Sequence, residues 1–326
     1  MTDRRTTATR AGFEDMEIVV KSQWPDREFE AVALDGGMTN RNWKVTVGEE
    51  TGPRDYAVQL LLPDDSAALI GINRDTHERV MHVVDRLRLG PRLVSWRREA
   101  PKAIISEYFE DRGADLAEDT TRAAGLAARA LALLHTSTVD ADLPGWISDP
   151  FEGIDWLFAS VETVAPDLAE QFRWAMEVNA RCGRARGPYT SCLLHSDLSR
   201  GNVLVNPSGV GLIDWEYAGL GDRYYDCADF VEKWELDLDQ EQVFLDGYRK
   251  DEPLDFLAAV IYMYRFTSRL REGLWAASIS KANFIEFDHV GYAKSCLQRL
   301  VEIAESPRFD DSVEAVAAAR DGRGAR

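Results

Sequence analysis

Three polar residues with short, regular spacing carry the clearest chemical signal in the sequence. Asp197 and Asn202 lie five residues apart in the stretch HSDLSRGN, and Asp214 follows twelve residues after the asparagine. A carboxylate can orient a hydroxyl for attack, and an amide and a second carboxylate supply the oxygen ligands that magnesium prefers. The trio therefore predicts phosphoryl transfer from a nucleotide triphosphate, with Asp197 facing the hydroxyl and Asn202 and Asp214 holding magnesium.

The flanking residues predict the elements that position this trio. Ser191–Leu194 and Val203–Val205 are typical of short buried strands, and a turn then leads to a third strand, Gly211–Ile213, which would deliver Asp214 beside Asn202. Protein kinases use the related motif H-R-D-x-x-x-x-N, although serine occupies the arginine position here. A chance match in a polar loop is the alternative, and the flanking strands favour catalysis.

Composition limits the partners of the chain. Its 326 residues, 45% of them hydrophobic, suit two lobes of unequal size. The net charge of -18 speaks against nucleic acid or an anionic membrane surface as a partner, because both require basic patches. A cationic substrate suits this charge better, and a simple role in solubility is the alternative.

Neither the cysteines nor the apolar segments indicate export or membrane insertion. The four cysteines are widely separated and predict reduced thiols rather than a disulfide framework or a zinc site. The amino terminus has no apolar run typical of a signal peptide, and no stretch approaches the roughly 20 apolar residues of a membrane span. We expect a cytoplasmic protein without membrane insertion.

Periodicity predicts an α+β, two-lobed, protein-kinase-like fold. Residues 1–109 would form a small N-lobe with a nucleotide-binding sheet and a helix, and residues 110–326 a large, mainly helical C-lobe with the catalytic loop, the metal site and the acceptor pocket. The expected helices are 13–23, 73–89, 123–135, 255–276 and 292–305, and the expected strands fill 29–61, 92–97 and 103–108. We expect the last fifteen residues to fray.

The join between the lobes is a candidate adenine site. Glu107 to Phe109 end the last strand of the small lobe, where exposed backbone groups can pair with an adenine edge. An ordinary strand end is the alternative.

Several separated segments between Leu34 and Leu300 carry a family resemblance. They are DGGMTNRNW at 35–43, INRDTHE at 72–78, LLH at 133–135, LIDWEYAG at 212–219, YDCADF at 225–230, GLW at 273–275 and IEFDHVGYA at 285–293. The second of these looks like the N-R-x-x-E helix start of the choline/ethanolamine kinase family. As a set they resemble that family, particularly its bacterial choline kinase branch, within the aminoglycoside phosphotransferase-like group.

The resemblance implies roles for further residues. ATP and Mg²⁺ would be the cofactors, with Gly36, Gly37, Thr39 and Asn40 in the loop that covers the phosphates. The acceptor would be a cationic small molecule. Trimethylammonium groups are held by aromatic faces and carboxylates, for which the candidates are Tyr217, Trp275 and Tyr292 with Glu216 and Glu232, and more loosely Trp234. Ordinary core packing is the alternative for each aromatic residue.

The sequence departs from this family at two positions. Gln59 stands where kinases have the strand Lys or Arg that grips the phosphates and pairs with a helix glutamate, here Glu78. Lys44 is the preferred substitute cation, and Arg74 is the alternative. Glu272 replaces a common aromatic residue of the acceptor pocket, which would make the pocket more acidic.

These observations predict an ATP- and magnesium-dependent small-molecule kinase that phosphorylates the hydroxyl of choline or a related amino alcohol. One alternative is a kinase of the same fold for an aminoglycoside or another cationic natural product. The other is a nucleotide-binding pseudokinase, which Gln59 favours and the complete trio opposes.

Overall fold

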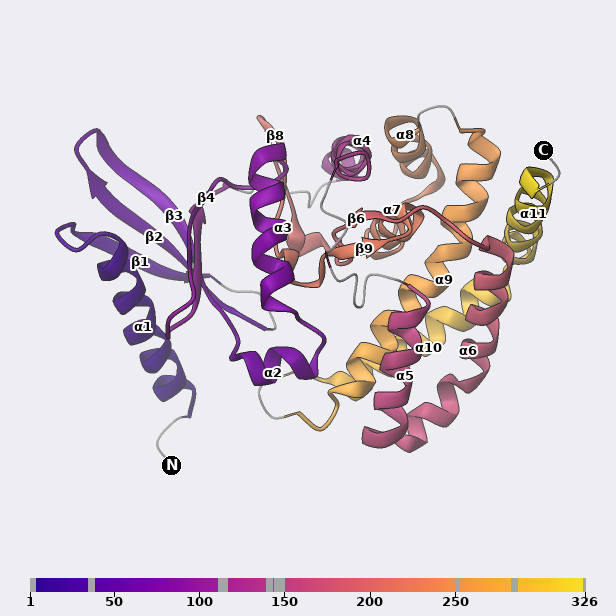
Figure 1. Cartoon of the computed structure of the whole chain (residues 1–326), viewed down its shortest axis with the longest axis horizontal. Helices are drawn as coiled ribbons and strands as arrows, with labels where there is room; N and C mark the ends of the chain where they lie inside the picture. Colours follow the sequence, from indigo (N-terminus) through magenta and orange to yellow (C-terminus); the bar gives the residue numbers. More distant parts are fainter. Residues whose placement is uncertain are drawn as a thin grey trace.

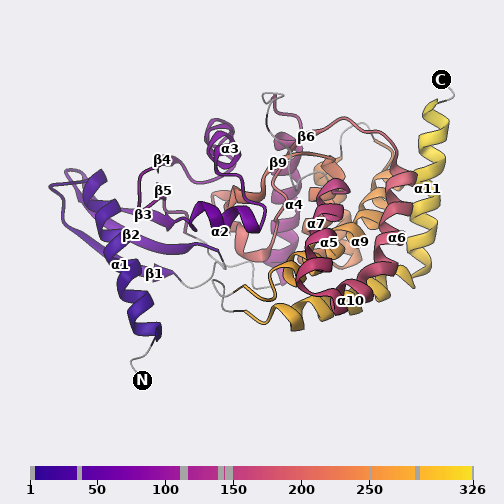
Figure 2. The same ribbon diagram turned by 60° about the horizontal axis from the view of Figure 1, so that its bottom comes forward.

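The computed structural model describes residues 4–34, 39–110, 117–138, 143, 150–249, 252–282 and 287–324. A sheet and three helices make up the smaller part of the molecule, and a larger part is mostly helical (Figure 1). The two termini lie at opposite ends (Figures 1 and 2). The expected α+β class is confirmed.

A five-stranded antiparallel sheet forms the smaller part, in the order β1-β2-β3-β5-β4. The strands are β1 Phe29–Leu34, β2 Arg41–Glu49, β3 Gly52–Leu60, β4 Leu93–Arg97 and β5 Ala103–Glu107. Buried and less buried residues alternate along β2, as expected for a strand with one covered face. Helix α1, Arg4–Gln23, covers that face through Met16, Val19 and Val20, which pack against Trp43 and Val58.

Helix α3, Arg74–Leu87, links the sheet to the rest of the molecule. Its first turn is capped by Asn73, whose side chain accepts a hydrogen bond from the Thr76 N–H at 3.0 Å. Its apolar side chains, with Ala67 of the short helix α2, Asp64–Leu69, join the core of the helical part rather than that of the sheet. The sheet keeps a core of its own with α1. The lobe boundary at residues 109 and 110 stays a prediction.

Eight helices are described in the larger part. They are α4 Ala117–Leu134, α5 Glu152–Val164, α6 Pro166–Arg186, α7 Arg223–Lys233, α8 Leu238–Tyr248, α9 Leu254–Ser278, α10 His289–Ala304 and α11 Pro307–Gly324. Helix α9 is the central one and packs against α5, α7, α10 and α11 (Figure 1). The expected fraying of the last residues is wrong as far as Gly324, because α11 continues there and buries Val313 and Val316.

Two short two-stranded antiparallel sheets carry the catalytic segment. Strand β6, Cys192–Leu194, pairs with β9, Gly219–Gly221, and β7, Val203–Asn206, pairs with β8, Gly209–Leu212. Single helical turns, η1 Arg200–Asn202 and η2 Trp215–Tyr217, follow β6 and β8. The three predicted catalytic strands are confirmed.

The two parts meet at Gly90. The Leu212 N–H donates to the Leu89 carbonyl at 2.8 Å, and a Cβ at Gly90 would lie 2.5 Å from the Leu212 carbonyl oxygen. Only glycine fits at this approach without a shift. Among the described residues, no helix is long and apolar enough to cross a membrane.

Candidate active site

A cleft of about 720 Å³ separates the sheet from the helical part. One half is apolar and is lined by Leu34, Ala57, Met81, Val84, Ile104, Leu204 and Leu212. The strand end Glu107–Phe109 borders this half, and Phe109 packs against Gly211 of β8. A flat aromatic ring system fits such a slot, while the polar half suits phosphates and an acceptor.

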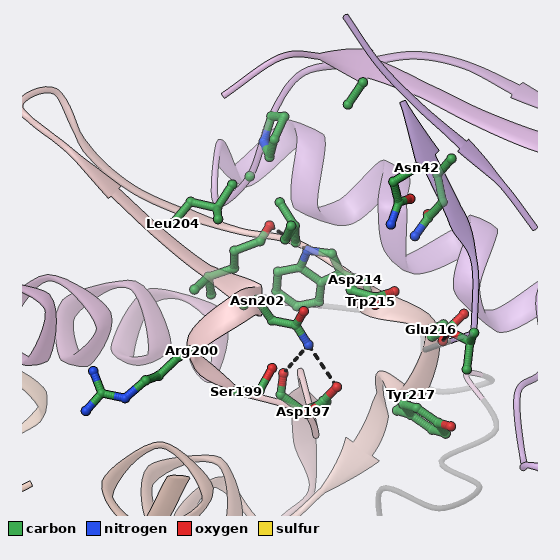
Figure 3. A pocket seen from close by; sticks show the side chains of 18 of the residues that line it. Asn42, Asp197, Ser199, Arg200, Asn202, Leu204, Asp214, Trp215, Glu216 and Tyr217 are labelled. Carbon is green, nitrogen blue, oxygen red and sulfur yellow. Dashed lines mark hydrogen bonds between the residues drawn. The ribbon is translucent and has the colours of Figure 1, made fainter. Parts of the chain in front are cut away.

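Asp197 and Asn202 face each other in the polar half (Figure 3). The Asn202 Nδ2 donates to Asp197 Oδ2 at 2.8 Å and to the Asp197 carbonyl at 3.0 Å. Lys233 Nζ donates to the other carboxylate oxygen, Oδ1, at 2.7 Å. Burial alone would raise the pKa of Asp197, but the Lys233 ammonium outweighs it and lowers that pKa. Asp197 is therefore an ionised acceptor of hydrogen bonds, as a group that orients a hydroxyl must be.

The loop that carries Asp197 is fixed from beneath by two acids of α7. Asp226 accepts the backbone N–H groups of His195 and Ser196, both at 2.8 Å, and Asp229 accepts that of Leu198 at 2.7 Å. These bonds hold Ser196 at a φ of 68°, a left-handed conformation that costs a non-glycine residue energy. Asp226 therefore braces the loop and is not itself directed at the cleft's hydroxyl-facing side.

Asp214 lies next to this loop (Figure 3). It follows β8 in a left-handed conformation with a φ of 63°, and its neighbour Ile213 donates its N–H to the Asn202 carbonyl at 2.9 Å. Burial and then the carboxylates of Glu216 and Asp197 raise the pKa of Asp214 well above its usual range, whereas Gln59 and Arg74 act in the opposite direction.

The donor set at Asp214 and Asn202 fits magnesium. Asp214 Oδ1 is buried and has no hydrogen-bond partner among the described residues, so an oxygen ligand is available for a cation. The Asn202 amide donates through its nitrogen and leaves its oxygen for the same purpose. Two side-chain oxygens suit a cation that usually keeps waters and substrate phosphates as its other ligands.

Glu216, two residues after Asp214, connects this side of the cleft to the smaller part of the molecule through hydrogen bonds. Its carboxylate accepts hydrogen bonds from Thr39 Oγ1 at 2.5 Å, Asn40 Nδ2 at 2.8 Å and Arg74 Nη1 at 3.2 Å. Glu216 was expected to contact the acceptor; its contacts are with the phosphate-side loop instead. Thr39 lines the cleft, in keeping with the expected role of that loop.

Gln59 lines the cleft as the strand alternation predicts. It pairs across the sheet with Asn42, which also lines the cleft (Figure 3). From α3, His77 faces the same space, and burial followed by the charge of Arg74 lowers its pKa well below the usual value. Kinases usually have a strand lysine or arginine and a helix glutamate here. In this chain the neutral amide of Gln59 and the neutral imidazole of His77 occupy the two positions.

The far end of the cleft is lined by the predicted acceptor residues Tyr217, Glu272, Trp275 and Tyr292. Trp275 Nε1 donates to the Tyr217 hydroxyl at 2.9 Å, and the Tyr292 hydroxyl donates to Glu272 at 3.0 Å. These side chains come from η2, α9 and α10, so the fold brings together residues that are 75 positions apart.

Residues 30–257 match the model of the phosphotransferase enzyme family. The chain belongs to the phosphotransferase enzyme family. A choline/ethanolamine kinase family protein from Mesorhizobium loti has the same fold, with a TM-score of 0.73 at 18% identity, covering 95% of this chain and 99% of that one. This likeness confirms the protein-kinase-like architecture predicted from the sequence.

Curated relatives match shorter segments of this phosphotransferase. A protein LicA homolog of Metamycoplasma hominis is 41% identical over 61 residues, 19% of this chain and 24% of the relative. Human ethanolamine kinase 1 is 25% identical over 167 residues, 44% of this chain and 36% of the relative. The chain thus spans well under half the length of the curated relatives it matches.

Besides that of Glu216, three further expected roles in the phosphotransferase need correction. Glu78 does not face Gln59: it binds Arg98 on the outside of α3, while His77, Met81 and Val84 form the face that lines the cleft. Counted from Asn73, the acidic position of N-R-x-x-E falls on residue 77, so the motif itself identifies the histidine.

Lys44 is the second correction. Its Nζ binds Asp55 at 2.7 Å and lies 4.7 Å from the ring centre of Tyr108, beside the end of β5 rather than beside Asn202 and Asp214. It is not among the described residues that line the cleft. Arg74, the alternative, is the cation that acts on Asp214.

Glu232 is the third correction. It is buried behind the pocket and binds Arg265, Arg269 and Arg299, so no oxygen is directed at an acceptor.

Trp234, the looser candidate for the acceptor pocket, is also buried and supports the catalytic loop by donating to the Leu198 carbonyl at 3.1 Å. Gly36 and Gly37 lie outside the described residues.

Lys233 is the main functional residue that the sequence reasoning missed. A signal was present, because Asp226, Asp229 and Lys233 lie three and four residues apart and share one face of α7. Since that face supports the catalytic loop, Lys233 rather than its neighbour Glu232 points at Asp197.

Proposed function

We propose that this phosphotransferase is an ATP- and magnesium-dependent small-molecule kinase that phosphorylates an alcohol hydroxyl. One observation carries the proposal: a single cleft contains the ionised carboxylate of Asp197, held on both oxygens, beside Asn202 and an Asp214 oxygen that has no hydrogen-bond partner within the described part of the chain. A binding module would have no need for an acid that faces the acceptor.

Different residues of the cleft would bind the nucleotide, bind the metal and orient the acceptor hydroxyl. The apolar half of the cleft would take the base, with Glu107–Phe109 at its edge. Asn202 and Asp214 would hold magnesium, which, when bound, neutralises charge on the phosphates. Asp197 would accept a hydrogen bond from the acceptor hydroxyl and align its oxygen with the terminal phosphorus. The O–P bond to the acceptor forms as the bond to the ADP oxygen breaks, and the hydroxyl proton passes to the Asp197 carboxylate late in the transfer.

Choline and related amino alcohols are the first acceptors to test. The names of the choline/ethanolamine kinase relatives support them, and so do the aromatic faces of Tyr217, Trp275 and Tyr292 beside Glu272. Neutral and acidic alcohols are a second class, favoured by one observation: the ammonium of Lys233 already lies in this part of the cleft.

A screen of ATP consumption tests the proposal. The purified chain would be incubated with MgATP and choline, ethanolamine, an aminoglycoside, neutral alcohols or hydroxy acids, with Asp197→Asn as the inactive control. We expect acceptor-dependent formation of ADP and a phosphomonoester with at least one class. Tight nucleotide binding without transfer to any acceptor would instead support a pseudokinase, and transfer to the antibiotic alone an aminoglycoside kinase.

A further inference from the structure

Lys233 places a fixed positive charge beside the catalytic carboxylate. Its Nζ lies 2.7 Å from Asp197 Oδ1, 3.0 Å from Glu272 Oε1 and 3.3 Å from Asp229 Oδ2. The side chain is only 8% exposed, yet it lines the cleft. Although burial alone would lower the pKa of Lys233, the three carboxylates raise it well above its usual value, so the ammonium stays charged.

The two acids that could attract a cationic acceptor, Asp197 and Glu272, are therefore already paired with the Lys233 ammonium. In the acceptor half, Asp197 and Glu272 share Lys233, and the guanidinium groups of Arg269 and Arg271 line the same wall. Arg271 is 5% exposed on its side chain, donates to the Ser196 carbonyl, and its buried Nε has no hydrogen-bond partner among the described residues. On this wall Asp197 and Glu272 therefore face three cationic side chains, those of Lys233, Arg269 and Arg271, before any acceptor binds.

The position of the Lys233 ammonium beside Asp197 affects which acceptors can bind. A hydroxyl that donates to Asp197 brings its neighbouring atoms close to Lys233, because both bind the same carboxylate. A quaternary ammonium two carbons from that hydroxyl would meet a like charge in a site with little water to screen it. An uncharged group of the same shape would meet no such repulsion, and an acidic group would be attracted.

We propose that Lys233 determines acceptor specificity by selecting against cationic alcohols, so that the preferred acceptor is an uncharged or acidic hydroxyl compound. The proposal rests on the proposed kinase function and narrows its substrate class. In it, Tyr217 and Trp275 contribute an apolar wall rather than a cation-binding cage.

The test compares two acceptors of the same shape that differ in charge, choline and 3,3-dimethylbutan-1-ol, with 3-hydroxypropanoate as an acidic alcohol. We expect the wild type to have a higher kcat/KM for the neutral isostere than for choline. Lys233→Met should shift the ratio of the two values toward choline by roughly tenfold or more, as removal of a poorly screened like charge would. A general loss of Asp197 alignment lowers both values and cancels in the ratio.

Lys294→Met is the matched control, because Lys294 is exposed on α10, and its ratio should equal that of the wild type. Calorimetric binding of the same pair, in the presence of an unreactive ATP analogue, measures the ratio without turnover. Wild-type preference for choline over its isostere, or a ratio that Lys233→Met leaves unchanged, overturns the inference. Selective binding without transfer to any acceptor counts against the kinase proposal and leaves the charge selection standing.

Discussion

Asp197 is held by two donors of different character, and each has a separate consequence. The neutral Asn202 amide fixes the direction of the carboxylate, whereas the charged Lys233 keeps it ionised. A carboxylate with a lowered pKa is a weak base, so we infer that Asp197 contributes mainly by orienting the hydroxyl. This suits a loose transition state in which proton removal comes late.

Substitution of the two acids separates hydroxyl orientation from metal binding. We expect Asp197→Asn to reduce kcat by about 10² or more while leaving MgATP affinity close to that of the wild type. Asp214→Ala should abolish turnover and also weaken nucleotide binding in the presence of magnesium. Calorimetric titration with an unreactive ATP analogue, with and without magnesium, distinguishes the two effects. Asp246→Asn, on the exposed face of α8, serves as the control.

Arg74 and Lys44 differ in their relation to the phosphate side of the cleft. Arg74 contacts Glu216, which also holds Thr39 and Asn40, whereas Lys44 is paired with Asp55 near Tyr108. We expect Arg74→Met to raise the KM for ATP by about tenfold, as loss of a charge-assisted contact would, and Lys44→Met to change it much less. The reverse order in steady-state kinetics would restore Lys44 as the substitute for the missing strand cation.

At the scale of elements, α7 is the support of the active site. Its Asp226 carboxylate binds two backbone N–H groups of the catalytic loop and also His135 Nε2 at 3.1 Å. Burial would raise the pKa of Asp226, but these hydrogen bonds lower it. Because the folded pKa lies below the ordinary value of 3.8, the stabilisation is present above that ordinary value and is lost as the pH falls through the lower folded pKa.

Removal of this acid should therefore loosen the whole loop. We expect Asp226→Ala to lower the free energy of unfolding by about 2–4 kcal/mol at neutral pH, because two buried donors lose their acceptor. Urea denaturation of the variant and the wild type at pH 7 measures the difference. A change below about 0.5 kcal/mol, the size typical of surface substitutions, would contradict the bracing role.

The elements around the trio could be predicted because their signals are local. The three short catalytic strands, the start of the helix near residue 73 and the alternation that directs Gln59 into the cleft all follow from neighbouring residues. Glu232 and Lys233 could not be told apart in this way, since their directions depend on how α7 packs. The pairing of Lys44 with Asp55 across β2 and β3 depends on strand register, which the sequence does not fix by itself.

At the scale of the whole molecule, the cleft depends on close contact between its two walls at Gly90. A methyl group there would press on the Leu212 carbonyl, two residues before Asp214. We expect Gly90→Ala to lower stability by about 1–3 kcal/mol, as overpacking does, and to weaken nucleotide binding because the walls are forced apart. Thermal unfolding with and without a nucleotide analogue measures both effects.

The matched control for this substitution is Gly322→Ala. An added Cβ there has no neighbour within 4 Å among the described residues, and alanine is the better helix former. We expect Gly322→Ala to be neutral or slightly stabilising with unchanged nucleotide binding. Equal behaviour of the two variants would mean that the contact at Gly90 does not hold the cleft together.

The most direct test of the proposed function is to observe the transferred group itself. Phosphorus NMR of the chain with ATP, magnesium and the best acceptor should record growth of a phosphomonoester signal as the γ-phosphate signal of ATP declines. We expect the new signal to require magnesium and to be absent with Asp197→Asn. Inorganic phosphate as the only product, or an ester formed equally well by Asp197→Asn, would contradict the assignment of this cleft as a kinase active site.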